Sequence, residues 1–240
     1  MPIGIYAAAA GMAAQQVKLD AIANDLSNTG TAGYKGVRVG FRDLVYAERD
    51  GVPVGSGAAA VDAGRSMRQG AMASSGDPLS VAIDGRGYFQ VRAADGTVAL
   101  TRDGSFKLDA KGELVTATGA RLVPPVTLPA NAAQEDVAIG ADGTITVAGA
   151  AAGRLALVEV PAPEGLRALG DNLFAVTTAS GAAKPATAPG EIRQGMLEGS
   201  NVDVATSMVE LMTAQRSFEL ASRAIRMQDQ LMEIANGIRG

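Results

Sequence analysis

The sequence predicts an α+β protein in which long N- and C-terminal coiled-coil helices flank an antiparallel, all-β middle domain. Apolar residues recur every seven positions near both ends, short runs of period two fill the middle, and glycine-containing turn dipeptides separate those runs. The expected division is a helix and turn over residues 1–34, an extended Gly/Ala-rich connector over 35–78, a β domain over 79–199, and a helix over 200–240 that packs with the first.

The N-terminal helix is predicted from a strict repeat of seven, carried by Ile5, Met12, Leu19 and Leu26. An ideal α-helix drifts about 20° per heptad against such a repeat, so the stripe indicates a helix that supercoils with partners. Asn28, Gly30 and Gly33 favour turn conformations. The helix is therefore expected to close before Tyr34.

The C-terminal helix is predicted over a stretch, residues 200–236, that contains no glycine or proline, with Asn201 and Asp203 as candidate caps. Its first stripe is Val204, Leu211, Phe218, Ile225 and Met232, again seven apart. A second stripe lies on nearly the opposite side and comprises Leu220, Met227 and Ile234, with Leu231 beside them. One N-terminal helix can cover only one of these sides, so the helix is expected to have several neighbours. The alternative is a monomer in which the two helices simply pair with each other.

The middle of the chain reads as eight or more short antiparallel strands. The dipeptides predicted to form hairpin turns between them are Asp84-Gly85, Asp95-Gly96, Asp103-Gly104, Lys111-Gly112 and Asp142-Gly143.

Composition excludes several classes of function. The chain has no histidine and no cysteine, which removes histidine–zinc, zinc-finger and haem–thiolate sites, cysteine proteases and His-assisted serine hydrolases. A formal net charge of −4 argues against nucleic-acid binding. No run of 18 apolar residues predicts a membrane span, and the start lacks the basic segment of a secretory signal.

The remaining polar motifs favour structure over chemistry. Asp84, Asp103, Asp109 and Glu113 could form a two-carboxylate hydrolase site, but three of them lie in or beside turns, where aspartate caps its own backbone. Asp84-Gly85-Arg86-Gly87 lacks the third glycine and the helix of a nucleotide-binding turn. We expect no catalytic residue, no cofactor and no metal site. The competing hypotheses are a β-domain binding or adhesin module with helical oligomerisation ends, and a carboxylate-based hydrolase.

Three groups of segments together resemble the bacterial flagellar basal-body rod and hook protein family, rod proteins of the FlgG/FlgF type. The first is Ala23 to Lys35, similar to the family's A-N-N-L-A-N-x-x-T-x-G-[FY]-K, from which Asp25 and Ser27 depart. The second is Val81 to Val91 followed by Thr101-Arg102-Asp103-Gly104-Ser105-Phe106. The third is Leu197 to Val204, followed by Met208 to Leu211 and Ala214 to Glu219.

The resemblance implies a structural subunit that polymerises into a helical axial tube and transmits torque for motility. Its partners would be other copies of itself, other rod and hook subunits and the flagellar export apparatus, with no nucleic acid and no small-molecule substrate. It would be exported without a cleavable signal peptide and reside in the basal-body rod, with a distal position favoured over a proximal one.

The resemblance also assigns roles to residues. The packing seam would comprise the residues spaced seven apart on each helix together with Met227 and Leu231. On the first helix these are Ile5, Met12, Leu19 and Leu26, and on the second they are Val204, Leu211, Phe218, Ile225 and Met232. Asn24 and Asn28 would cap the helix or fix its register, and Gly30 and Gly33 would turn the chain before Tyr34.

Overall fold

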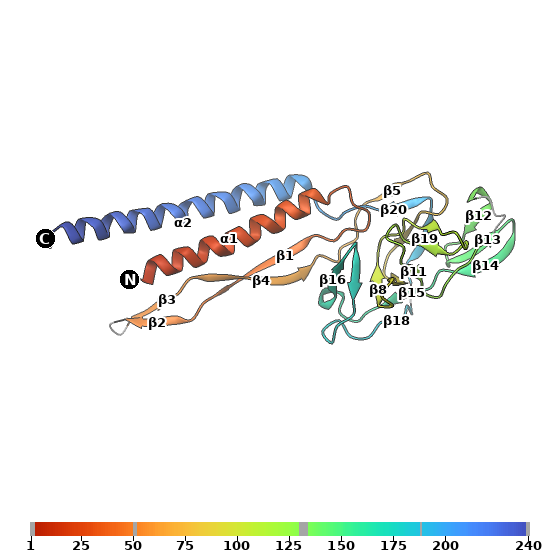
Figure 1. Ribbon diagram of the computed structural model, residues 1–240, viewed down its shortest axis with the longest axis horizontal. Coiled ribbons are helices and arrows are strands. Elements are labelled where there is room, and N and C mark those ends of the chain that lie inside the picture. The colour runs from red at the N-terminus through yellow and green to blue at the C-terminus, as the bar shows by residue number, and fades with distance from the viewer. Residues whose placement is uncertain (1–2, 50–51, 130–133, 188, 239–240) are drawn as a thin grey trace. The chain divides into compact units, whose positions relative to one another are not determined.

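The computed structural model describes residues 3–49, 52–129, 134–187 and 189–238. These residues form two compact units (Figure 1). The helical unit comprises residues 3–27, 37–63 and 203–238, and the β unit comprises residues 28–36 and 64–202. The chain therefore enters the β unit twice and leaves it twice. The predicted α+β class, with terminal helices packed together and an antiparallel middle, is confirmed.

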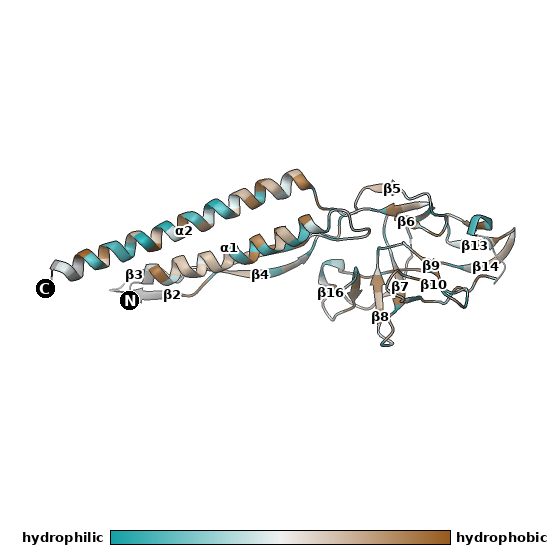
Figure 2. Cartoon of the chain, turned by 45° about the horizontal axis from the view of Figure 1, so that its top comes forward, coloured by the Kyte–Doolittle hydropathy of each residue, from teal (hydrophilic) through white to brown (hydrophobic). Residues whose placement is uncertain are grey.

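The helical unit pairs α1 (Ile3–Ser27) with α2 (Val204–Ile238). The helices run antiparallel, since Gly4 lies level with Gln228 while Lys18 lies level with Glu210. Hydrophobic and hydrophilic residues alternate along α2 (Figure 2). Neither described helix combines the length and the apolar content that a membrane crossing requires.

The segment predicted as an extended connector is extended, but its strands are paired. β1 (Val37–Asp43) pairs with β4 (Ala58–Arg65), and β2 (Tyr46–Arg49) forms a hairpin with β3 (Val52–Gly55). Gly57 explains how this ribbon approaches α1. Its φ is +103°, and a Cβ there would lie 2.8 Å from the Ala7 carbonyl oxygen. Glycine at position 57 thus permits the ribbon to pack closely against α1.

The β unit is built on a nine-stranded sheet with a main path of β16-β17-β8-β7-β11-β10-β9; β15 adds beside β7, and β18 adds beside β15. Its strands are β7 (Tyr88–Arg92), β8 (Val98–Thr101), β9 (Lys107–Leu108), β10 (Leu114–Val115), β11 (Arg121–Leu122), β15 (Leu157–Glu159), β16 (Arg167–Gly170), β17 (Leu173–Ala175) and β18 (Lys184–Pro185).

Smaller sheets complete the β unit. A three-stranded sheet contains β12 (Val137–Ile139), β13 (Thr144–Val147) and β14 (Ala150–Arg154), while β6 (Val81–Asp84) pairs with β19 (Glu191–Gln194), and β5 (Met72–Ser74) with β20 (Met196–Glu198). Short 3-10 helices lie at Gln134–Asp136 and Pro163–Gly165. The core is mostly aliphatic around one aromatic pair, Phe89 and Phe106, whose rings meet edge to face at 5.2 Å.

Two of the five predicted hairpin turns are wrong. Asp95-Gly96, Lys111-Gly112 and Asp142-Gly143 connect paired strands. Asp84-Gly85 instead connects β6 to β7, and Asp103-Gly104 connects β8 to β9, and neither of these pairs is hydrogen-bonded. The reason is that β6 has other partners. It pairs with β19, and the Val81 amide donates a hydrogen bond to the Gly104 carbonyl.

Of the two candidate caps, only Asp203 caps α2. Asp203 lies one residue before the helix begins at Val204, and its carboxylate accepts a 2.7 Å hydrogen bond from the Thr206 amide. Hydrogen bonds from Thr206, first from its side chain and then from its backbone amide, lower the pKa of Asp203 below its usual value. The expected cap role of Asn201 is wrong, because its side chain bonds the β unit instead.

Candidate assembly site

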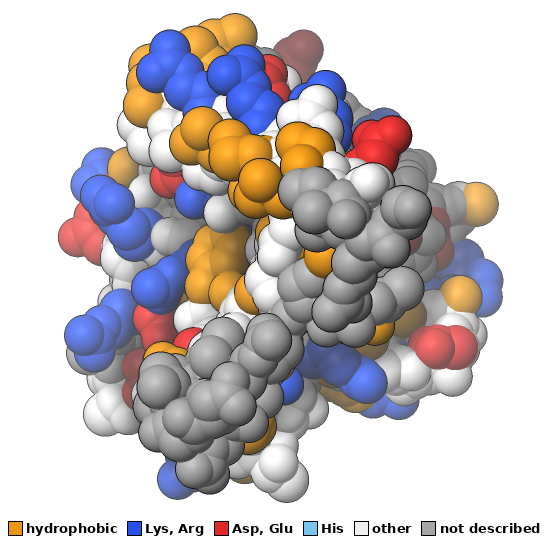
Figure 3. Space-filling view, turned by 90° about the vertical axis from the view of Figure 1, so that its left-hand side faces the viewer, with side chains coloured by type: hydrophobic (Ala, Val, Ile, Leu, Met, Phe, Trp, Pro, Cys, Tyr) orange, Lys and Arg blue, Asp and Glu red, His pale blue; other side chains and the backbone are white. Residues whose placement is uncertain are grey.

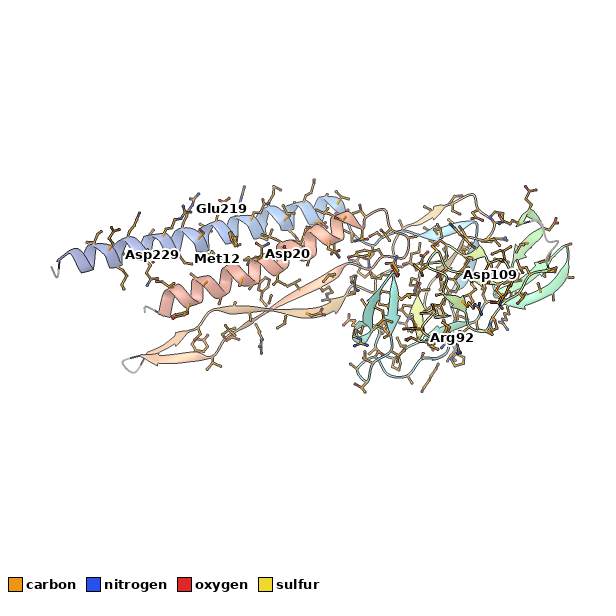
Figure 4. The ribbon with its side chains drawn as sticks, in the orientation of Figure 1. Met12, Asp20, Arg92, Asp109, Glu219 and Asp229 are labelled. Atoms are coloured by element: carbon orange, nitrogen blue, oxygen red, sulfur yellow. The ribbon has the colours of Figure 1, made fainter. Side chains whose placement is uncertain are left out.

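The predicted helix stripes occupy two environments within the helical unit. Leu211, Phe218 and Ile225 are half-buried on the side of α2 that α1 covers, and Ala214 between them is buried. The stripe of α1, comprising Ile5, Met12, Leu19 and Leu26, is half-buried throughout, and Figure 4 labels Met12. At the two ends of the α2 stripe Val204 and Met232 are 46% and 43% exposed.

Among the residues that the structure describes, none covers the second side of α2. Leu220, Met227, Leu231 and Ile234 are each 60% or more exposed. Viewed from the helical end of the chain, hydrophobic side chains lie on the surface among lysine and arginine side chains (Figure 3). A row of large apolar side chains in water is typical of a surface that other proteins bury.

The turn after α1 begins the β unit. The Asn28 carboxamide accepts a hydrogen bond from the Thr31 hydroxyl, and Asn24 lies exposed in the last turns of α1. Gly30 has open space around it. Gly33 has a φ of +69°, and a Cβ there would lie 2.6 Å from the Asp103 amide nitrogen, so only glycine fits. Tyr34 is buried, with the Arg65 guanidinium over its ring.

Directly after this turn lies a cluster of buried charges that the sequence reasoning missed. Lys35 comes from residues 28–36, the segment between α1 and β1 that we call the strap. Arg102 follows β8, and Glu198 ends β20. Lys35 and Glu198 are 1% and 0% exposed, and Arg102 is 6% exposed. Each of the three segments that carry the family resemblance therefore contributes one charged residue to a single site.

Glu198 is the shared acceptor of this ionic cluster, which we define as Lys35, Arg102 and Glu198. One carboxylate oxygen accepts hydrogen bonds from the Lys35 ammonium and, at 3.0 Å, from the Gly70 amide. The other lies 3.3 Å from Arg102 Nη1. The Glu198 carbonyl also accepts a 2.7 Å hydrogen bond from the Gly33 amide. One glutamate thus bonds the strap at Gly33 and Lys35, the backbone at Gly70, and Arg102 after β8.

The two cations are held by further acceptors. Lys35 Nζ donates to the Arg68 carbonyl at 2.7 Å, and Arg102 Nη2 donates to the Gly85 carbonyl at 2.9 Å. The Arg102 guanidinium also lies 5.0 Å from the centre of the Tyr88 ring. With two cations and one carboxylate, the cluster carries an excess positive charge in the interior.

Burial has the largest effect on the pKa of Lys35. The loss of water lowers the pKa of Lys35 from its ordinary 10.5, against the opposing effect of Glu198, and Arg102 lowers it further. Burial likewise raises the pKa of Tyr88. These shifts follow from packing a charged group in a protein interior and do not require a catalytic role.

Asn201 fastens the same region with all of its amide atoms. Its nitrogen donates to the carbonyls of Ser66 and Arg68 at 2.7 and 2.8 Å, and its oxygen accepts from the Gly36 amide at 2.9 Å. Asn201 thereby joins three segments near the edge of the β unit: the one before β1 at Gly36, the one after β4 at Ser66 and Arg68, and its own segment before α2. No local pattern distinguishes these residues, because the motif segments around them contain many other polar residues.

The carboxylates considered for hydrolysis do not form an acid–base pair. Asp103 and Asp109 accept hydrogen bonds from amides of their own turns, at Ser105 and at Lys111 and Glu113. Asp84 pairs with Arg193, and Glu113 with Arg121. Within the described ranges, no three acidic residues are close enough to hold a metal ion. A cavity of about 290 Å³ beside Tyr88 has a single carboxylate, Glu159, in its described lining.

Comparison with known protein families gives three matches in chain order. Residues 5–35 match the model described as flagella basal body rod protein, residues 82–147 the flagellar hook protein FlgE/F/G D1 domain, and residues 193–238 the flagellar basal body rod FlgEFG protein C-terminal model. The ionic cluster takes Lys35 and Arg102 from the first two matched segments and Glu198 from the third.

Individual relatives match over nearly the full length. The chain is 38% identical to flagellar basal-body rod protein FlgG of Borreliella burgdorferi, with 98% of each chain covered. It is also 38% identical to FlgG of Agrobacterium fabrum, over 95% of this chain and 96% of the relative. Identity to flagellar basal-body rod protein FlgF of Caulobacter vibrioides is 32%, over 91% and 89%.

Proposed function

Because this chain belongs to the family of flagellar basal-body rod proteins, with relatives of the FlgG type, we propose that it polymerises through α1 and α2 into the distal part of the rod. The family is structural and not enzymatic. The subunit's partners would be copies of itself and adjoining rod or hook subunits, and the assembled tube would transmit torque. The flagellar export apparatus would carry it across the cytoplasmic membrane.

The observation that carries this proposal is the exposed second side of α2. α1 covers the side with Leu211 and Ile225, while Met227 and Leu231 are 63% and 61% exposed. Burying a large apolar side chain contributes about 1.5–3 kcal/mol. Burial of Leu220, Met227, Leu231 and Ile234 would therefore supply a substantial part of the free energy of a subunit interface. Lateral neighbours in a tube would bury them.

Substitution on the two sides of α2 tests the proposal. Met227→Asp places a charge where a neighbour would pack, and an unpaired buried charge costs several kcal/mol. We expect full-length Met227→Asp to remain folded and to lose assembly in sedimentation, and to fail to restore motility to a strain that lacks the rod subunit. Leu211→Asp should lose assembly too, because it also weakens the α1–α2 pair.

Arg226→Ala is the matched control, since Arg226 is exposed and lies about 100° around the helix from both Met227 and Ile225. It should assemble as the parent does. Normal assembly of Met227→Asp together with failure of Leu211→Asp would mean that α2 has one partner side, and would refute the multi-neighbour tube.

A further inference from the structure

The cavity beside Tyr88 lies entirely within the β unit and is walled by packed residues. Its described lining consists of Met67, Arg86, Gly87, Tyr88, Arg102, Glu159, Val160, Pro161 and Pro163. Tyr88 and Val160 belong to a buried hydrophobic cluster against which Met67 also packs. The two prolines restrict the backbone of the segment that follows β15. The wall of the cavity is therefore held in place by the fold of the β unit.

The cavity carries more positive than negative charge. Arg86 and Arg102 line it together with a single described carboxylate, Glu159, so the charged side chains of the described lining sum to +1. Lys35 and Glu198, the other members of the ionic cluster, have opposite charges and leave this sum unchanged. One negative charge would therefore balance the cavity, whereas a doubly charged oxyanion would reverse its sign.

The guanidinium of Arg102 is incompletely used by the fold. Its Nη1 and Nη2 donate to the Glu198 carboxylate and the Gly85 carbonyl, whereas its Nε is buried and has no hydrogen-bond partner among the described residues. Arg102 is only 6% exposed, and charges in a protein interior are screened less than in water. An anion in the cavity would offset this charge through the electric field, without a bond to the enclosed Nε.

Arg86 supplies the accessible cation of the cavity. Its side chain is exposed and forms no ion pair with another described residue. Its backbone is fixed, because it lies between Gly85 and Gly87, whose φ values are +114° and +129°, and its carbonyl accepts a 2.8 Å hydrogen bond from the Gly190 amide. The turn that starts at Asp84 has no role in nucleotide binding, and it places an arginine at the cavity.

We propose that this cavity binds a carboxylate, with Arg86 donating to the carboxylate oxygens and with Met67 and Val160 contacting a short aliphatic stem. The guanidinium fork matches the two oxygens of a carboxylate, and the single charge of that group balances the cavity. The group belongs either to a free short-chain carboxylate or to a glutamate side chain of a polypeptide. The site goes beyond the proposed function, because no residue of α1 or α2 contributes to its described lining.

Titration of the dilute full-length protein, followed by NMR of its backbone amides at constant ionic strength, tests the site. The probes are sodium butyrate, the peptide acetyl-Ala-Glu-Ala-amide, its glutamine analogue and sodium sulfate. The amides of Gly87 and Val160 should shift saturably with at least one of the two carboxylates, while the amide of Arg92 should not. The glutamine peptide and sulfate should bind about tenfold more weakly or less. A response to butyrate alone would identify a free carboxylate as the source, and a response to the glutamate peptide alone would identify a polypeptide.

Three substitutions assign the binding to named side chains. Arg86→Gln should weaken carboxylate binding about tenfold or more, because it removes a charge-assisted hydrogen bond. Glu159→Gln should strengthen binding about threefold or more, because it removes the competing negative charge. Arg92→Gln is the matched control, since Arg92 is exposed on β7 outside the lining (Figure 4 labels Arg92), and it should leave binding unchanged. A thermal melt of each variant checks that it is folded.

Several results would overturn the carboxylate site. One is the absence of a saturable shift at Gly87 and Val160 with either carboxylate. Others are equal affinities of Arg86→Gln and Arg92→Gln, weaker binding by Glu159→Gln, and binding of sulfate as tight as that of the carboxylates. Assembly is measured separately by sedimentation, so a failure of the proposed rod function and a failure of this site are distinguishable.

Discussion

Glu198→Gln is the most informative single change in the β unit, because Glu198 is the only carboxylate in the ionic cluster. The substitution preserves size and leaves Lys35 and Arg102 as two buried cations without a counter-charge. Removing one partner of a buried ion pair costs about 3–5 kcal/mol. For a domain of this size that corresponds to a fall in melting temperature of about 6–20 °C.

Lys35→Met provides the internal comparison. It removes the excess cation while Glu198 keeps Arg102 and the Gly70 amide as partners, so only hydrogen bonds worth about 1–2 kcal/mol are lost. The assay is thermal and urea unfolding of the full-length monomer, followed by far-UV circular dichroism. The exposed pair Asp84–Arg193 is the control, and Asp84→Asn should cost under about 1 kcal/mol.

Glu198→Gln should lower the free energy of unfolding more than Lys35→Met does. If Lys35→Met destabilises the protein as much as Glu198→Gln, the excess positive charge has no energetic consequence and the account of the cluster is wrong. A loss below about 1 kcal/mol for Glu198→Gln would show that water or rearrangement supplies the missing counter-charge.

Three other outcomes are expected. Gly33→Ala forces a Cβ to within 2.6 Å of the Asp103 amide at positive φ and should cost several kcal/mol in a urea melt, whereas Gly30→Ala, with open space around it, should cost under about 1 kcal/mol. Asn201→Asp replaces two donated hydrogen bonds with a carboxylate facing the Ser66 and Arg68 carbonyls, and should destabilise the β unit by about 2–4 kcal/mol, while Asn201→Ala should cost less. Because the pKa of Lys35 is lowered in the folded state, the unfolded chain binds more protons between that pKa and 10.5. The free energy of unfolding should therefore rise with pH over this window, up to about pH 10, and Lys35→Met should abolish the rise. Above pH 10 the raised pKa of Tyr88 has the opposite effect on stability.

Local patterns in the sequence predicted the elements whose cause is local. The spacing of seven from Leu211 to Ile225 follows from helix geometry, so the half-buried side of α2 could be predicted without a structure. The hairpin at Asp95-Gly96 likewise depends on a few adjacent residues. The family and its structural function followed from motifs at both ends and in the middle of the chain.

Contacts between distant segments could not be predicted in this way. The turn at Asp84-Gly85 has hairpin chemistry, yet β6 pairs with β19 more than 100 residues later. Lys35 and Glu198 are 163 residues apart, and no periodicity connects them. Their charges indicate exposed positions in isolation, and only the fold shows that they neutralise each other in the interior.

The separation of Lys35 from Glu198 has a consequence for the order in which the molecule forms. A chain that is synthesised from its N-terminus presents the strap long before Glu198 exists, so Lys35 stays hydrated until nearly the whole β unit has emerged. Closing so long a loop carries a large entropic cost that only the accumulated packing of the intervening strands can offset. The ionic cluster is therefore expected to form late in folding. A chain that ends before Glu198 cannot form the contacts that join the first and last segments of the β unit.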